Sequence, residues 1–290
     1  MFVRFWGTRG SIPTPSATTR KYGGNTSCVS IAHGDSLLIC DGGTGLRELG
    51  ESLMGGDSDL TAHMFFSHTH WDHIQGFPYF APVYSPRNTI NIWASPEQGG
   101  RIHKLLSGQM RSEYFPVAFR ELKANIISKG LRVGGSEIDG VTVTTHPQYH
   151  PGGCIAFRFS SEKGSVVYAT DHELDLSITN VEESEADPNV LRKLPKGFVD
   201  FCAGADLLIV DSQYTDEEYL SKRGWGHPRA TTAVDLAVQA GAGNLALFHH
   251  DPMQSDKAVD DKVEVCAERA RMHGSELVVF GAREGLELKI

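Results

Sequence analysis

The chain has 290 residues, and its 27 Lys and Arg residues are outnumbered by 36 Asp and Glu residues, so the formal net charge at pH 7 is −9. This acid excess disfavours broad electrostatic capture of nucleic acid or of anionic membranes, although it leaves a local basic groove open. A hydrophobic fraction of 40% and a charged fraction of 22% are typical of a folded globular protein and exclude a disordered chain.

The first half of the chain predicts short strands separated by turns. β-Branched or aromatic runs bounded by Gly or Asp are expected as strands at Val3–Trp6, Thr26–Ala32, Ser36–Cys40 and Thr61–Ser67. A short amphipathic helix is expected over Leu46–Leu53. Farther along, Asn91–Ala94 predicts a strand, and Pro96–Met110 predicts a helix because its apolar residues recur at helical spacing.

The second half again alternates strands with helices. Strands are expected at Val141–Thr145, Ile155–Ser160, Ser165–Ala169, Leu207–Val210, Asn244–Phe248 and Glu276–Phe280. Helices are expected at Thr231–Gln239 and Ser255–His273, and the acidic stretch Val181–Pro188 predicts a solvated loop or helix surface. Because strands outnumber helices and several helices follow strands, the pattern favours a layered α/β sandwich. No repeat or linker divides residues 1–290, so we expect a single domain.

Two features bear on the compartment. No apolar run approaches the roughly 20 residues of a membrane helix, and no signal-peptide pattern precedes the first expected strand. The five cysteines are scattered and never spaced CxxC, which favours reduced, mostly buried thiols over disulfides. We therefore expect a cytoplasmic protein without a membrane partner.

Metal-binding side chains crowd into the segment Ser67-His68-Thr69-His70-Trp71-Asp72-His73, directly after an apolar run. If the strand continues through His70, then His68 and His70 point to one face, because side chains alternate along a strand. Asp72 and His73 would lie in the turn beyond the strand, where they could reach a second ion. Imidazoles with a carboxylate suit zinc, manganese or iron better than calcium or magnesium.

This HxHxDH motif resembles the metal-binding motif of the metallo-β-lactamase superfamily. The resemblance implies a four-layer αββα sandwich of two mixed β-sheets flanked by helices, with two divalent metal ions at its edge. It assigns His68, His70 and His150 to one ion, Asp72, His73 and His249 to the other, and Asp171 to a bridge between them. Zinc is the first choice for these ions, with manganese or iron as alternatives.

Two of these matched histidines have another histidine nearby in the sequence that could take the same role. His146 lies four residues before His150, and the His-Pro-Gly context favours His150. His250 follows His249, and the family's register of a strand followed directly by histidine favours His249. Asp41 matches the turn aspartate that supports the HxHxDH segment in this family, and it would equally cap its own turn.

A second set of residues resembles the phosphodiesterase branch of the superfamily, which includes tRNase Z and the cyclic phosphodiesterases. His227, in Gly224-Trp225-Gly226-His227, matches the additional histidine of this branch, and Asp211 matches its acidic partner. The resemblance gives His227 the role of proton donor to the leaving oxygen, or of phosphate ligand. A carboxylate beside an imidazole is a suitable acid catalyst near neutral pH.

The chain departs from this branch in three places. His227-Pro228-Arg229 stands where the family commonly has His-Ser-Thr, so we expect Arg229 to bind the substrate phosphate as a guanidinium clamp. The Gly/Pro-rich basic arm with which tRNase Z grips tRNA is not recognisable. The region around 77–130 is longer than a simple connector, and we expect it to cover the core, with a lid or a homodimer contact as alternatives.

Together these residues predict a dinuclear metal-dependent phosphodiesterase for a small or cyclic phosphodiester, such as a cyclic nucleotide. The metals would activate water, Asp72 would accept or hold its proton, and His227 with Asp211 would protonate the departing alkoxide. The alternatives are a tRNase Z-like ribonuclease, which would need nucleic acid as a partner, and an acyl hydrolase for thioesters or lactones. A non-catalytic metal-binding sensor is disfavoured, because every expected ligand position is filled.

Overall fold

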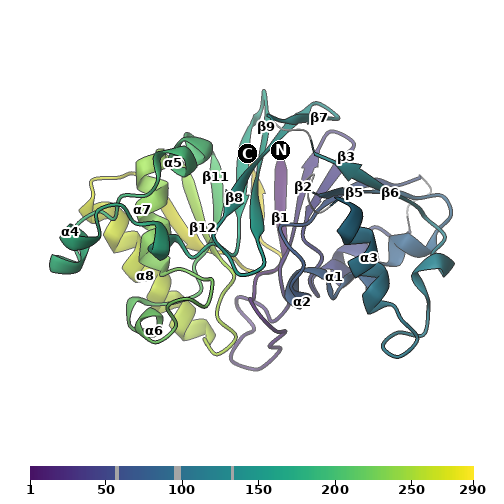
Figure 1. Ribbon diagram of the computed structural model, residues 1–290, viewed down its shortest axis with the longest axis horizontal. Coiled ribbons are helices and arrows are strands. Elements are labelled where there is room, and N and C mark those ends of the chain that lie inside the picture. Colours follow the sequence, from purple (N-terminus) through teal and green to yellow (C-terminus); the bar gives the residue numbers. More distant parts are fainter. Residues whose placement is uncertain (56–58, 95–98, 132–133) are drawn as a thin grey trace.

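The computed structural model describes residues 1–55, 59–94, 99–131 and 134–290. Two seven-stranded β-sheets face each other in the middle of the molecule, and helices cover the outer face of each sheet (Figure 1). This arrangement confirms the expected αββα sandwich of two mixed sheets.

The first sheet has the strand order β14-β1-β2-β3-β4-β5-β6. Its strands are β1 (Phe2–Gly7), β2 (Cys28–His33), β3 (Ser36–Cys40), β4 (Thr61–Phe65), β5 (Thr89–Ala94), β6 (Asn125–Gly130) and β14 (Glu287–Lys289). Pairing is antiparallel from β14 to β3 and parallel from β3 to β6. The carboxyl ends of β3 and β4 therefore lie at the same edge of this sheet.

The second sheet repeats this plan with the order β13-β12-β11-β10-β9-β8-β7. Its strands are β7 (Ser136–Ile138), β8 (Val141–Gln148), β9 (Cys154–Ser161), β10 (Gly164–Ala169), β11 (Leu207–Asp211), β12 (Asn244–Phe248) and β13 (Val278–Gly281). Pairing is antiparallel from β7 to β10 and parallel from β10 to β13. The carboxyl ends of β10, β11 and β12 thus share one edge.

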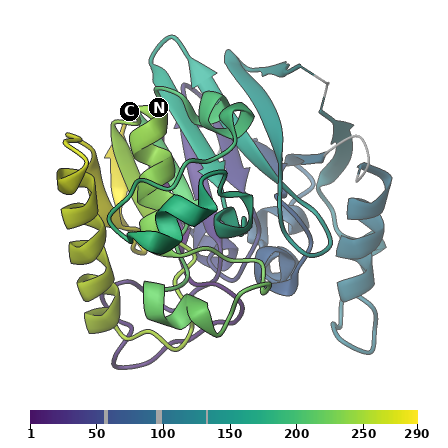
Figure 2. The same ribbon diagram turned by 60° about the vertical axis from the view of Figure 1, so that its left-hand side comes forward.

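The helices form the two outer layers, and Figure 2 shows α8 and α3 at opposite sides of the molecule. The first sheet is accompanied by α1 (Leu46–Ser52), α2 (Trp71–Ile74) and α3 (Gly99–Gln109), and by the 3-10 turns η1 (Phe77–Tyr79), η2 (Ala81–Tyr84) and η3 (Phe119–Glu121). The second is accompanied by η4 (Leu174–Ser177), α4 (Val181–Ala186), α5 (Lys196–Cys202), α6 (Asp216–Leu220), α7 (Ala230–Ala240) and α8 (Asp256–Met272).

Three apolar clusters hold these layers together. The cluster between the sheets is rich in aromatic rings, among them Phe5, Phe65, Phe157 and Phe248, all fully buried. A second cluster lies between the second sheet and α5, α7 and α8, and a third lies between the first sheet and α1 and α3. Because helices or the opposite sheet cover both faces of the parallel strands, β11 is buried throughout, as its apolar run Leu207–Val210 requires.

The strand expected over Thr61–Ser67 ends earlier, at Phe65, so the condition that it continues through His70 is not met. His68 and His70 therefore lie in the connection between β4 and α2, and Asp72 and His73 lie on the short helix α2 itself rather than in a turn.

Residues 77–130 supply β5 and β6 to the first sheet, and Ile102 and Leu106 of α3, with Met110 directly after it, belong to the third apolar cluster. The start of the helix expected over Pro96–Met110 lies outside the described residues, and α3 begins at Gly99. This region therefore covers the core, which is the role that the sequence favoured for it. A role as a lid or as a contact in a homodimer stays a prediction.

None of the helices in the described ranges is long and apolar enough to cross a membrane. All five cysteines are buried and none is bonded to another, which confirms the expectation of free, buried thiols.

Candidate metal centre and active site

The histidines and aspartates predicted from the motifs converge at the edge where parallel strands of both sheets end. Asp41 follows β3, His68, His70, Asp72 and His73 follow β4, His150 follows β8, Asp171 follows β10, Asp211 ends β11, and His249 follows β12. Chain crossovers separate these segments, so only the tertiary fold brings their side chains together.

Several of these side chains are directed into the site by unusual backbone conformations. Of the five non-glycine residues with positive φ in the described ranges, Ser11, Asp41, Asp171 and His249 lie in or beside the cluster, with φ between 54° and 66°. Such left-handed conformations cost L-residues free energy and gather at functional sites, where the surrounding structure enforces them. At Asp41 and His249 the conformation falls directly after a strand, and at Asp171 it falls two residues after β10, so in each case it turns the chain away from the sheet.

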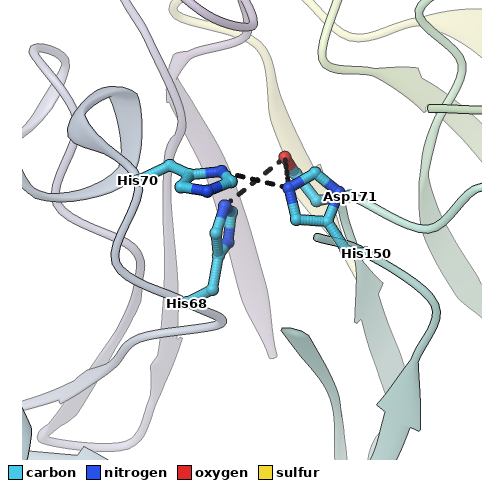
Figure 3. A group of neighbouring side chains, drawn as sticks. All are labelled: His68, His70, His150 and Asp171. Atoms are coloured by element: carbon cyan, nitrogen blue, oxygen red, sulfur yellow. Dashed lines mark hydrogen bonds and ion pairs between the residues drawn. The ribbon is translucent and has the colours of Figure 1, made fainter. Parts of the chain in front are cut away.

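The first candidate metal group consists of His68, His70, His150 and Asp171, whose ligand atoms all lie within 4.8 Å of one another (Figure 3). The Nε2 atoms of His68 and His150 are each 3.6 Å from Oδ2 of Asp171. Nδ1 of His70 is 3.0 Å from Nε2 of His150. Three imidazoles and a carboxylate at such spacing form a typical tetrahedral ligand set.

The second candidate group consists of Asp72, His73 and His249. The Nε2 atoms of His73 and His249 each lie 3.2 Å from Oδ2 of Asp72. They also approach Oδ1 of Asp171, at 3.2 Å and 3.4 Å. Asp171 thus directs one carboxylate oxygen to each group, which is the arrangement expected of a bridging ligand.

Asp41 holds the HxHxDH segment in place, as its match to the family turn predicted. Its carboxylate accepts hydrogen bonds from the amide and hydroxyl groups of Ser67, both at 2.7 Å, and from the hydroxyl of Tyr168 at 2.7 Å. It also lies 2.8 Å from Nδ1 of His73, so Nε2 of this ring faces the second group. Hydrogen bonds to the outer nitrogen of a ligating histidine orient such rings in metal sites.

The buried charges of the cluster fit divalent cations. The Nε2 atoms of His68 and His73 are buried and make no hydrogen bond within the described part of the chain, although the Asp171 carboxylate lies 3.6 Å and 3.2 Å from them. Burial opposes protonation of His73, yet the carboxylates of Asp171, Asp72 and Asp41 hold its pKa well above the usual range. Burial also opposes ionisation of Asp171, yet His249, His73 and His68 hold the pKa of this carboxyl group well below its usual range. The site therefore favours added positive charge, which bound cations supply.

The structure also separates the rival histidines. His250 is turned away from the cluster, and its Nε2 atom lies 2.9 Å from the carbonyl of Ala282. His146 packs against the rings of Phe198 and Phe201. His249 and His150, which the local contexts favoured, are the members of each pair that join the cluster.

His227 and Asp211 form a hydrogen-bonded pair beside both groups. Nδ1 of His227 lies 2.7 Å from Oδ2 of Asp211, and its ring stacks on His249 with 4.9 Å between centroids. Burial alone would lower the pKa of His227, but the Asp211 carboxylate outweighs burial and raises the pKa to about 9. Asp171, Asp211, His227 and His249 are also close enough to hold an ion themselves.

A cavity of about 620 Å³ opens over the cluster and is lined by His70, His150, Asp171 and His227. Arg229 is not among the described residues that line it. Its Nε atom instead pairs with Oδ1 of Asp175 at 2.7 Å, and its side chain borders a separate hollow beside α4 and α6. The structure therefore does not bring Arg229 to the place where the sequence predicted a phosphate clamp.

Sequence reasoning missed Lys222, which lines this cavity and whose ammonium group lies 3.0 Å from Oδ2 of Asp251. It also missed Glu173, a fully buried carboxylate that accepts hydrogen bonds from the amides of Gly224 and Gly226. Its position two residues after Asp171 was the available signal, since charged residues flanking a ligand turn often support it.

Comparison with known proteins agrees with this geometry. A family model described as a beta-lactamase superfamily domain matches residues 40–250. Ribonuclease Z of Haloarcula marismortui is 24% identical over 279 residues, with 86% of each chain covered. Ribonuclease Z of Haloferax volcanii is 24% identical over 278 residues, covering 86% of this chain and 84% of its own.

Solved structures share the fold over almost the whole chain. The metallo-beta-lactamase fold protein YhfI from Bacillus subtilis superposes with a TM-score of 0.67 at 20% identity, covering 99% of this chain and 98% of its own. A diphosphatase from the PhnP family has a TM-score of 0.67 at 16% identity, and the match covers 100% of this chain and 97% of the diphosphatase. The short form of human tRNase Z has a TM-score of 0.65 at 18% identity, and the match covers 100% of this chain and 99% of the human protein.

The family match spans most of the chain and every residue of both candidate metal groups. The chain therefore belongs to the beta-lactamase superfamily, as its HxHxDH motif predicted. Within that superfamily it is a metal-dependent hydrolase.

Proposed function

We propose that the protein is a dinuclear phosphodiesterase that hydrolyses a small phosphodiester, such as a cyclic nucleotide. The observation that carries this proposal is the His227–Asp211 pair, with 2.7 Å between Nδ1 and Oδ2, of which His227 lines the cavity above the candidate metal groups. A phosphodiester releases an alkoxide that needs a proton, whereas acyl hydrolysis on this fold needs the metals but not this pair.

His68, His70 and His150 would hold one ion, and Asp72, His73 and His249 would hold a second, with Asp171 available to both groups. This nitrogen-rich donor set favours zinc, with manganese and iron as alternatives. When bound, the ions would supply Lewis-acid activation of water and neutralise charge on the phosphate oxygens.

The chain's own residues then manage the protons. Asp72 accepts a hydrogen bond from the Ser11 amide at 2.7 Å, which fixes its carboxylate where it can take a proton from the attacking water. As the bond from phosphorus to the leaving oxygen breaks, Nε2 of His227 donates a proton to that oxygen. Asp211 holds the opposite nitrogen, so the ring keeps one orientation and one protonation pattern.

A ribonuclease of the tRNase Z type is the second candidate, and the names of the curated relatives favour it. The net charge of −9 weighs against it, because RNA binding relies on contacts between basic residues and phosphates. Acyl hydrolysis follows as the third candidate.

The deciding experiment compares substrates on metal-reconstituted protein. A cyclic nucleotide, bis(p-nitrophenyl) phosphate, a precursor tRNA, a thioester and a lactone are assayed at physiological salt. We expect turnover of the two small phosphodiesters to exceed that of the others. Efficient 3′ processing of the precursor with poor cyclic-nucleotide turnover would replace our proposal with the nuclease, and selective thioester or lactone cleavage would replace it with the acyl hydrolase.

The role of His227 is tested with two leaving groups. His227→Ala should reduce turnover of a phosphodiester with an alkoxide leaving group by roughly 10²–10⁴, and much less with p-nitrophenolate, which departs without a proton. Metal content should persist, because a lost ion would instead make His227 a ligand. His146→Ala removes a histidine outside the cluster and serves as the matched control. Equal losses on both substrates would refute proton donation.

A further inference from the structure

Two of the four tryptophans of the chain stand exposed beside the candidate active site. Trp71 is 72% exposed and Trp225 is 63% exposed, and both line the cavity that contains His227. A single exposed apolar side chain is ordinary on a protein surface. Two exposed indoles that line the same cavity are less common. A ligand that covers both of them removes apolar surface from water, which favours its binding.

The two rings come from opposite halves of the sandwich and from backbone that is held firmly. Trp71 begins α2, between His70 and Asp72 of the two candidate metal groups. Trp225 lies between Gly224 and Gly226, whose amides donate to the Glu173 carboxylate at 2.6 Å and 2.7 Å. Neither tryptophan belongs to the three apolar clusters of the core.

The remaining wall of the cavity is partly apolar and carries one ammonium group. Met253 is 87% exposed at its margin, and Lys222 is held by Asp251 within it. A volume of about 620 Å³ is within the range of pockets that hold drug-sized ligands, which are similar in size to a mononucleotide. The cavity therefore offers flat aromatic faces and a cation beside a phosphate-handling centre.

We propose that this cavity binds a nucleotide and that Trp71 and Trp225 provide the stacking faces for its base. The substrate class is then a nucleotidyl phosphodiester rather than a phosphodiester of base-free alcohols. Aromatic side chains bind bases because every base has a π face, and this stacking tolerates different bases. The inference rests on the proposed function for the hydrolysis, but the binding of a base is separate from it.

Binding is measured first by calorimetry on metal-reconstituted protein, with AMP and the base-free analogue ribose 5-phosphate as probes. Wild-type protein should bind AMP more tightly than ribose 5-phosphate. Trp225→Ala and Trp71→Ala should each weaken AMP binding by about 5- to 100-fold, and the weakening of ribose 5-phosphate binding should be smaller. Trp225→Phe should recover most of the affinity, because a phenyl ring still stacks. Equal affinity of wild-type protein for both probes would overturn the proposal.

Turnover is measured with thymidine 5′-(p-nitrophenyl phosphate) and methyl p-nitrophenyl phosphate, which share one leaving group. Their ratio of kcat/KM isolates the contribution of the nucleoside. This ratio should fall at least fivefold in Trp225→Ala. The matched control is Phe2→Ala, which removes an aromatic ring that is 58% exposed on β1 and does not line the cavity.

The outcomes distinguish the two proposals. If both esters are hydrolysed and the ratio stays within twofold in both tryptophan variants, the nucleotide site is refuted and the phosphodiesterase stands. If neither ester is hydrolysed but AMP binding still depends on the tryptophans, the nucleotide site stands and the phosphodiesterase is refuted.

Discussion

The carboxylate of Glu173 accepts a hydrogen bond from the amide of Gly226 at 2.7 Å, and this contact joins the two halves of the active site. The carbonyl of the same glycine lies 2.9 Å from Nδ1 of His150, a candidate metal ligand. Gly226 has φ near 94°, and an added Cβ would lie 2.5 Å from Nδ1 of His150, so only glycine fits here. Glu173 thereby positions His150 and the loop that leads to His227.

Glu173→Gln should reduce activity by about 10- to 100-fold, the usual cost of losing an outer hydrogen bond in a metal site. One carboxylate oxygen accepts from Gly224 and from the Tyr219 hydroxyl, and the other accepts from Gly226. An amide replaces one of these acceptors with a donor. Tyr219→Phe removes one hydrogen bond and keeps both glycine contacts, so steady-state kinetics should show a smaller loss. A loss as large as that of Glu173→Gln would contradict the positioning role.

Reconstituted protein should contain about two divalent metal ions per chain, and Asp171→Ala should lose at least one of them. The reason is that Asp171 directs one oxygen toward each group, with Oδ2 at 3.6 Å from His68 and Oδ1 at 3.2 Å from His73. Elemental analysis after reconstitution with zinc, manganese or iron measures this directly. One equivalent or less in the wild-type protein with all three metals would defeat the dinuclear assignment.

Asp211→Asn should repeat the leaving-group pattern of His227→Ala more mildly. The asparagine amide keeps the contact to Nδ1 of His227 but removes the charge, so the ring stays while its orientation and proton are held less firmly. Turnover of an alkoxide-releasing diester should fall more than turnover of a p-nitrophenyl diester. If both substrates lose equally, Asp211 acts on the metals or on the fold rather than through His227.

Lys222→Ala should raise KM for a phosphodiester more than Arg229→Ala does. Lys222 lines the cavity, whereas the Arg229 guanidinium is committed to Asp175 outside it. Arg229→Ala should instead lower the free energy of unfolding by about 1–3 kcal/mol, because it leaves a buried carboxylate short of a partner. Kinetics and urea denaturation separate the two effects. A larger KM increase for Arg229→Ala would restore the phosphate clamp predicted from the sequence.

Stability should depend on pH through Lys262, which is buried and donates to the carbonyl of Ser212 at 2.7 Å and to Oε1 of Gln254 at 2.8 Å. Burial lowers its pKa from 10.5 to about 8. Between these values the unfolded chain binds more protons, so this lysine's contribution to stability rises with pH. Relative to Lys262→Met, the wild-type protein should gain up to about 1.4 kcal/mol per pH unit between about pH 8 and pH 10.5. Urea denaturation at pH 7 and pH 9 measures this, and a constant difference between the proteins would contradict it.

Much of the fold and of the ligand set could be predicted because the signals are local in the chain. The apolar runs Ser36–Cys40 and Asn244–Phe248 match β3 and β12 at both ends. His68, His70, Asp72 and His73 fall within six residues, so any compact backbone keeps them near one another. The short strands β7 and β14 have weak patterns and form because neighbouring strands pair with them.

The sequence by itself determined which residue types could bind metal and where strands would deliver them. Its resemblance to the phosphodiesterase branch also indicated Asp211 as the acidic partner of His227, and the structure places the two side chains 2.7 Å apart. Only the tertiary structure decided where Arg229 points, because its partner Asp175 lies 54 residues away in the chain. The tertiary structure alone also showed that Glu173 supports the loop that leads to His227. It showed as well that Lys222, Trp71 and Trp225 line the same cavity. Side-chain direction depends on contacts between remote segments, and local sequence patterns do not encode these contacts.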